Sequence, residues 1–115
     1  MKTVLITGDA PAPAPLRELV ERGSTSLLER RAAELAGAVT IEADRIVFWS
    51  AADEPDIRRL AEQYAQAEAA ERQEALVFVT AATGGTPPPD RLSPNEVFVW
   101  PRDEDRLRMA FLTGA

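Results

Sequence analysis

The sequence contains no cysteine and no histidine. Their absence excludes disulfides, thiol nucleophiles, imidazole bases and zinc sites built from these two residue types. It also excludes a hydrolase triad that relies on histidine. From the residue types that remain we predict no catalytic residue, no metal site and no cofactor.

Positive charge and long apolar runs are also scarce. The formal net charge is -6 at pH 7 and the pI is about 4.7, whereas a nucleic-acid-binding surface requires a basic patch. No apolar run approaches the length of a membrane span, and the first residues lack the pattern of a signal peptide. We therefore expect a cytoplasmic protein that binds neither nucleic acid nor membranes.

The chain is long enough for one hydrophobic core and too short for two. It has 115 residues, of which 45% are hydrophobic and 28% are charged, a balance typical of globular domains. We predict a single domain that spans residues 1–115.

The stretch at residues 2–9, an apolar run that ends in Gly-Asp, and the apolar runs at residues 46–50, 75–80 and 97–101 predict strands. The second and third runs are nearly continuous, which is typical of strands covered on both faces. The elements follow the order strand, helix, strand, helix, strand, loop, strand, helix. This order predicts an α/β domain with three layers: a mostly parallel sheet of four to five strands with helices on both faces.

The region after the first strand predicts helical structure. Pro15 suits the first turn of a helix. Ser26 and Glu29 have capping-box spacing and predict the start of a second helix, which Gly37 ends. A single long helix that runs through Gly23 is the alternative. The positions expected on the inward faces are Leu16, Leu19, Val20, Gly23, Leu27, Leu28, Ala32 and Leu35.

Residues 38–41 leave two interpretations open. Val39–Ile41 can form a short strand that pairs antiparallel with residues 46–50, because four residues cannot make a parallel crossover. The alternative is a single long strand with a polar interruption.

Two more helices and a long loop are predicted in the second half. Pro55 begins an amphipathic helix that runs to about Arg72, with Asp53 as its N-cap. Three consecutive prolines predict a surface loop to about residue 95. The last helix covers residues 103–112, and its inward positions are Leu107, Ala110 and Phe111.

The run Val4-Leu5-Ile6-Thr7-Gly8 resembles the opening of a short-chain dehydrogenase. In that family, further glycines let backbone N–H groups approach the pyrophosphate of a dinucleotide, but residues 9–15 contain no glycine. The family also has a Tyr-x-x-x-Lys pair, whereas here Tyr64 is followed four residues later by Glu68. We therefore do not expect dinucleotide binding. A second motif, Gly84-Gly85, is either an anion-binding nest or a turn before the prolines, and we favour the turn.

Residues 76–81 and 97–101 resemble the last two strands of a response-regulator receiver domain. The first ends in Thr80, at the position of the family's switch Thr/Ser, and the second ends in Trp100-Pro101, at its Lys-Pro position. The resemblance implies a flavodoxin-like sheet and a signalling or docking role.

The chain departs from the receiver pattern at the residues that carry its chemistry. One acid, Asp9, follows the first strand, where the family has two. Trp49 and Ser50 stand near the phosphoacceptor position, and Trp100 replaces the lysine. Phosphorylation of an aspartate needs a metal held by carboxylates and a cation. We therefore expect that the phosphorylation chemistry is lost.

These observations predict a non-catalytic, receiver-like domain that acts through contacts with a protein partner or in a homodimer. The alternative is a small-ligand or nucleotide-binding domain of Rossmann-like type. Both hypotheses use the carboxyl ends of the strands, where the two tryptophans are either core residues or part of a docking patch. The candidate pocket or docking edge comprises Asp9, Trp49, Ser50, Asp53, Thr80, Gly84, Gly85 and Trp100.

Overall fold

The computed structural model describes residues 2–8, 10–35, 43–51, 54–65, 75–82, 84–85, 87–90, 92 and 94–112. Within these ranges five strands form one sheet in the order β2-β1-β3-β4-β5, and every pair of neighbours is parallel. The strands are β1 (Lys2–Thr7), β2 (Ser26–Arg31), β3 (Arg45–Ser50), β4 (Ala75–Ala81) and β5 (Val97–Trp100). This is the flavodoxin-like strand order, so the predicted three-layer α/β fold is confirmed.

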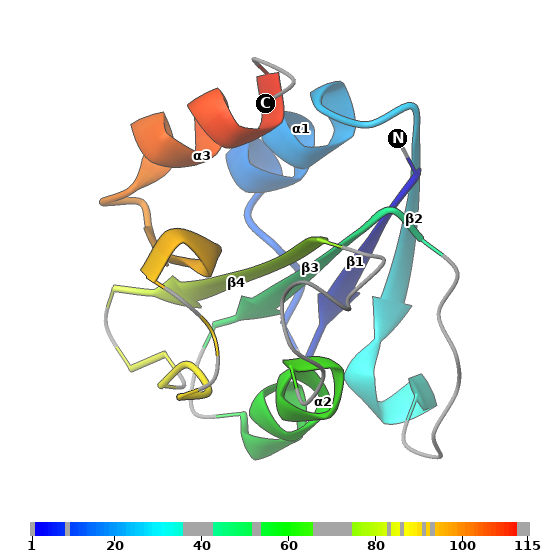
Figure 1. Cartoon of the computed structure of the whole chain (residues 1–115), viewed down its shortest axis with the longest axis vertical. Helices are drawn as coiled ribbons and strands as arrows, with labels where there is room; N and C mark the ends of the chain where they lie inside the picture. Colours follow the sequence, from blue (N-terminus) through cyan, green and yellow to red (C-terminus); the bar gives the residue numbers. More distant parts are fainter. Residues whose placement is uncertain are drawn as a thin grey trace.

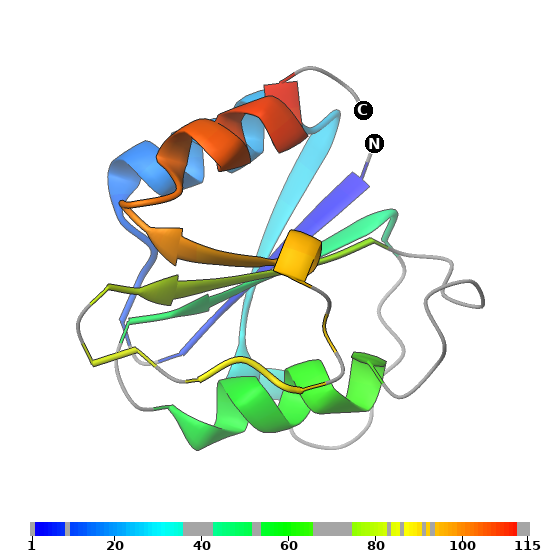
Figure 2. The same ribbon diagram turned by 60° about the vertical axis from the view of Figure 1, so that its left-hand side comes forward.

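The helices lie on both faces of the sheet, as Figures 1 and 2 show. Helices α1 (Ala14–Arg22) and α3 (Glu104–Leu112) pack side by side on one face. Helix α2 (Pro55–Ala65) covers the other face, together with the short 3₁₀ helix η1 (Ala32–Leu35). A second 3₁₀ turn, η2 (Pro94–Glu96), precedes β5. Among the described residues, no helix combines the length and hydropathy that a membrane span requires.

The three central strands are buried on both faces, which explains their continuous apolar sequences. On the face of α2, the rings of Phe48 and Phe78 are both fully buried, and their centroids lie 6.4 Å apart. Burial of each such side chain contributes about 2 kcal/mol to folding. The core residues on the opposite face, toward α1 and α3, are Leu5, Leu16, Leu19, Val20, Val47, Trp49, Val77, Val79, Phe98, Leu107 and Phe111.

The helix predicted from Ser26 is wrong in both of its forms, while its predicted end at Gly37 lies outside the described residues. Instead of a second helix or one long helix, Ser26–Arg31 forms the parallel edge strand β2, with Leu28 opposite Val4 of β1. Leucine, glutamate and arginine are good helix formers, but pairing of this stretch with β1 outweighs its helical preference. The Glu29 carboxylate accepts a hydrogen bond from Nε of Arg17 on α1, at 2.7 Å, and so does not cap a helix.

Helices α1 and α2 both begin near the predicted prolines, Pro15 and Pro55. Helix α1 buries Leu16, Leu19 and Val20 as expected, and α2 begins at Pro55. The interpretations of Val39–Ile41, and the expected continuation of α2 to Arg72, fall outside the described residues.

The C-terminal part of α3 packs tightly against α1 and the sheet. A Cβ atom at Gly23, just after α1, would lie 2.6 Å from Cβ and 2.7 Å from the carbonyl oxygen of Phe111. The guanidinium of Arg45 lies 4.2 Å from the centre of the Phe111 ring, and burial lowers the pKa of Arg45. Glycine at position 23 therefore permits the close approach of the two helices.

We expect Gly23→Ala to destabilise the protein by about 1–3 kcal/mol, because the added methyl group meets backbone atoms that cannot rotate away. The φ angle of Gly23 is -83°, which alanine adopts readily, so the loss would come from packing alone. Urea unfolding measures the change, and Arg22→Ala, at the exposed neighbouring position, is the control. Equal stability of the Gly23→Ala variant and the wild type would contradict this account.

Candidate functional site

The carboxyl ends of the parallel strands meet at one edge of the sheet, which we call the carboxyl rim. Ser50 of β3 lies opposite Thr80 of β4, and Ala81 lies opposite Trp100 of β5. The structure thus brings these predicted residues to a common edge. Asp9 and Asp53, the two acids of the predicted site, lie outside the described residues.

The hydroxyl groups at the carboxyl rim belong to buried residues. Ser50 is fully buried, Thr80 is 8% exposed and Thr7 is 9% exposed. A Cβ atom at Gly85 would collide with Oγ1 of Thr80 and with the backbone of Ala81. Since Gly85 lies directly against Thr80, this hydroxyl is not presented to a ligand.

Gly84 and Gly85 form part of the turn after β4. Gly84 has a φ of +77°, a left-handed conformation that favours glycine, and it is exposed. Gly85 makes the close approach to Thr80 described above. The geometry of both residues agrees with the turn interpretation.

The two tryptophans lie on the same face of the sheet, toward α1 and α3, but at different depths. Trp49 is 3% exposed, and its indole N–H has no hydrogen-bond partner among the described residues. Trp100 is half-buried and packs against the edge of the same core. Trp49 is therefore a core residue, and Trp100 is the tryptophan that reaches the surface.

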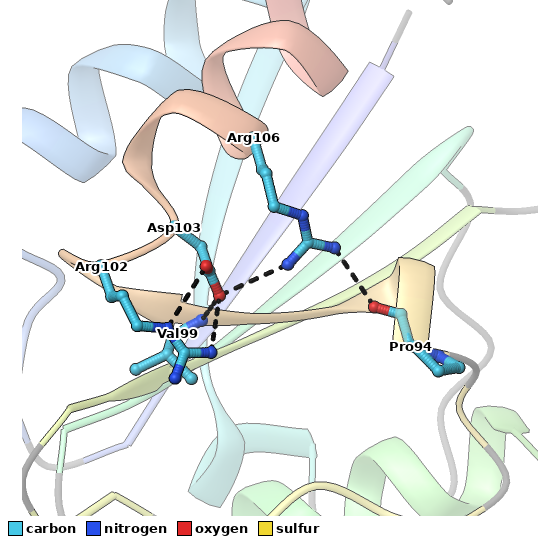
Figure 3. A network of polar contacts seen from close by, with 5 residues as sticks. All are labelled: Pro94, Val99, Arg102, Asp103 and Arg106. Carbon is cyan, nitrogen blue, oxygen red and sulfur yellow. Dashed lines mark hydrogen bonds and ion pairs between the residues drawn. The ribbon is translucent and has the colours of Figure 1, made fainter.

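Asp103 ties the edge strand β5 to the start of α3 (Figure 3). Its Oδ2 accepts a hydrogen bond from the Val99 N–H at 2.8 Å, and its own N–H donates to the Val99 carbonyl at 2.7 Å. The guanidinium groups of Arg102 and Arg106 lie 3.3 and 3.4 Å from Oδ2. The Val99 hydrogen bond, with smaller contributions from the two arginines, lowers the pKa of Asp103.

Arg106 extends this network to the segment before β5. It donates a hydrogen bond to the Pro94 carbonyl at 3.3 Å, and its guanidinium lies 4.7 Å from the centre of the Phe98 ring (Figure 3). These contacts join η2, β5 and α3. An unpaired, outward-facing N–H on an edge strand can pair with a strand of another chain. In β5 the carboxylate of Asp103 accepts the hydrogen bond of the Val99 N–H, so this group is not available for such pairing.

A pocket of about 140 Å³ lies at the other end of the carboxyl rim. It is found where the strand order reverses between β1 and β3, the usual ligand position in open α/β sheets. Three charged residues line it, Arg31, Glu54 and Asp56, and none of them belongs to the site predicted from the sequence. The pocket is lined by Gly8, Arg31, Ala32, Ala33, Glu54, Pro55, Asp56 and Ile57.

The carboxylate of Glu54 lies directly against Gly8, since a Cβ atom at residue 8 would overlap it. Oε2 of Glu54 also accepts a hydrogen bond from the Ala51 N–H at 3.3 Å. Glu54 therefore brings a negative charge to the gap between β1 and β3. In the sequence, the signal was an acid between a buried strand and a proline-initiated helix.

Within the described ranges, no three acidic side chains are placed to hold a metal ion. No family model matches the chain, and neither a curated protein nor a solved structure matches it. The evidence for a function therefore comes from the geometry of the carboxyl rim.

We expect Asp103→Asn to destabilise the protein by about 1 kcal/mol at pH 7, because it removes a charge-assisted hydrogen bond and two ion pairs. The pKa of Asp103 is lower in the folded than in the unfolded chain, so its stabilisation is complete above the unfolded value of about 3.9. The stabilisation is lost as the pH falls through the lower, folded value.

Unfolding free energies measured from pH 7 to pH 2 test this expectation. The difference between the wild type and Asp103→Asn should shrink toward acid pH. Asp105→Asn, which alters an exposed carboxylate in the same helical turn, should change stability less. A difference that is constant with pH would show that the charge of Asp103 does not contribute.

The unequal burial of the two tryptophans predicts unequal fluorescence quenching. With Trp100→Phe, only the buried Trp49 emits, so we expect emission at short wavelength and weak quenching by acrylamide. With Trp49→Phe, the half-buried Trp100 should be quenched more strongly. Equal quenching of the two folded variants would refute the assignment of Trp100 as the surface tryptophan.

Proposed function

We propose that the protein is a non-catalytic, receiver-like domain that binds a protein partner through the turn Trp100-Pro101-Arg102, here called the docking turn. The main support for the proposal is that all three residues of this turn are at least partly exposed to solvent. Trp100 is half-buried, Pro101 is exposed and the side chain of Arg102 is 71% exposed. Tryptophan and arginine are the residue types most enriched at the energetic centres of protein interfaces.

The docking turn is held by backbone hydrogen bonds on both sides. The Ala82 N–H donates to the Trp100 carbonyl at 2.9 Å, and the Glu104 N–H donates to the Pro101 carbonyl at 3.1 Å. The Asp103 network fixes the turn to β5 and α3. A surface that is already ordered loses less conformational entropy when it binds, which supports a role in recognition.

The chemistry of the docking turn specifies the kind of partner. The indole and proline rings favour a shallow apolar pocket, and the Arg102 guanidinium favours carboxylates at its border. Arg106 is also exposed nearby. Both arginines contact Asp103, and Arg106 also donates to the Pro94 carbonyl. The partner surface is therefore an apolar patch with an acidic edge, on another protein or on a second copy of this chain.

The receiver-like part of the proposal is supported by the sequence of the last two strands and by the strand order. The loss of phosphorylation chemistry is supported by the buried Ser50 at the end of β3 and by Gly8 after β1. Docking does not require that chemistry, since it uses only the end of β5.

Arg102→Glu tests the docking turn. The partner is first obtained by affinity capture with the purified domain and then purified itself, and self-association is measured by light scattering. We expect the charge reversal to raise the Kd of the reconstituted complex, or of the homodimer, by about tenfold or more. The physical reason is repulsion between the new carboxylate and the acidic edge of the partner.

Arg108→Glu is the matched control, because it reverses an exposed charge on α3, two turns away from the docking turn. We expect it to change the Kd by no more than about twofold. If both reversals had the same effect, or if Arg102→Glu had none while a complex formed, the docking turn would not be the binding surface. A strict monomer with no captured partner would refute the proposed function as a whole.

A further inference from the structure

The carboxyl rim carries both halves of a self-complementary contact. The docking turn at one end presents Pro101 and the Arg102 guanidinium, and the pocket at the other end, here called the rim pocket, has Asp56 in its lining. We infer that the partner of the docking turn is a second copy of this chain, and that the docking turn of each copy enters the rim pocket of the other. The inference rests on the proposed function, because it names the partner of the same surface.

The rim pocket has the size and the lining that one apolar side chain requires. Its volume is about 140 Å³, whereas pockets for drug-sized ligands have roughly 300–1,000 Å³. Ala33, Pro55 and Ile57 contribute apolar groups to its wall. A cavity of about 150 Å³ accommodates a six-membered ring, and the ring of the exposed Pro101 is smaller. Pro101 is therefore the residue of the docking turn that fits inside, with the half-buried Trp100 covering the border.

Asp56 supplies the acidic edge that the docking turn requires. Its side chain is 73% exposed, and Arg59 of the same helix contacts its Oδ1 at 3.4 Å. An exposed ion pair of this kind contributes little free energy, and a carboxylate accepts hydrogen bonds at both of its oxygens. Asp56 can therefore bind the guanidinium of a second copy and keep its contact with Arg59. The contact does not require Arg31 or Glu54, which have partners of their own.

The Arg102 guanidinium has donors left for a second carboxylate. It contacts Asp103 through Nε and Nη2, at 3.4 and 3.3 Å, whereas a guanidinium has five N–H donors in all. The two contacts with Asp103 also fix the position of this exposed side chain before the copies meet. A charged group that is already positioned loses less conformational entropy on binding.

The positions of the two sites allow both contacts to form in one dimer. The end of β5 and the start of α2 lie at the same edge of the sheet (Figure 2), and β1 and β5 are about 14 Å apart along it. A two-fold axis that passes midway between the two sites exchanges them, so each docking turn meets the rim pocket of the other copy. Both contacts lie within one standard interface, which buries about 800 Å² on each copy.

Analytical ultracentrifugation of the whole chain measures the Kd of the dimer. A salt concentration of about 0.15 M screens much of the repulsion between two chains of net charge -6. We expect Arg102→Glu and Asp56→Arg each to raise the dimer Kd by about tenfold or more, because each variant places like charges in both contacts. Ala33→Phe fills the rim pocket from an exposed position and should have the same effect.

A mixture of the two charge-reversed variants distinguishes this dimer from others. Equal amounts of Arg102→Glu and Asp56→Arg should form a mixed dimer with nearly the wild-type Kd. One of its contacts is native, and the other joins the new carboxylate at position 102 to the new guanidinium at position 56. A dimer in which the two docking turns touch each other would not be restored in this way.

Glu62→Arg is the control, because it reverses another exposed, ion-paired acid of α2 that lies outside the rim pocket. We expect it to change the dimer Kd by no more than about twofold. Circular dichroism establishes that each variant is folded.

Two results would overturn the inference and leave the proposed function in place. One is a wild-type chain that stays monomeric at millimolar concentration but binds a different protein more weakly after Arg102→Glu. The other is a dimer that Arg102→Glu weakens and that the mixture with Asp56→Arg does not restore. A wild-type dimer that is insensitive to Arg102→Glu would overturn both the inference and the docking turn.

Discussion

The structure depends on one constraint: an all-parallel sheet has no hairpins, so the chain must return across a face of the sheet after every strand. These returns cover the central strands β1, β3 and β4 on both faces, and their residues from Val4 to Ile6, Ile46 to Ser50 and Leu76 to Val79 are nearly all buried. Because the strands point the same way, every return begins at the carboxyl rim. The groups available for recognition are therefore those that the first residues of the returns place there, such as Gly8, Glu54 and Pro101.

The same constraint leaves two edge strands, and the protein protects them differently. Strand β2 is exposed along nearly its whole length and carries Glu29, Arg30 and Arg31, and charges on an edge discourage pairing with another chain. Strand β5 has only four residues, and Asp103 occupies the Val99 N–H that would otherwise face outward. The interaction that closes this edge also orients the docking turn, so edge protection and the proposed recognition depend on one carboxylate.

The strands that are buried on both faces were predicted correctly from the sequence, and the exposed edge strand was not. Strands β1, β3 and β4 were predicted because a strand that is buried on both faces has a continuous apolar sequence. Strand β2 was missed because an exposed edge strand does not need a continuous apolar sequence. Its residues also have the spacing of a helix start, from Ser26 to Glu29, by coincidence. The error had a consequence for the site: Arg31, assigned to a helix, was not expected at the carboxyl rim. Ser50 and Thr80 were expected there correctly, but their burial depends on how the loops close, which spacing does not reveal.

The carboxyl rim also sets the distance between its pocket and the docking turn. The pocket lined by Gly8, Arg31 and Glu54 lies at β1 and β2, while the docking turn follows β5. Three strand spacings separate β1 from β5, or about 14 Å. A standard protein interface buries about 800 Å² on each partner, which corresponds to a radius of about 16 Å. A partner centred on the docking turn would therefore cover the carboxyl ends of β4 and β3 and reach the pocket, because all five strands end at the same edge.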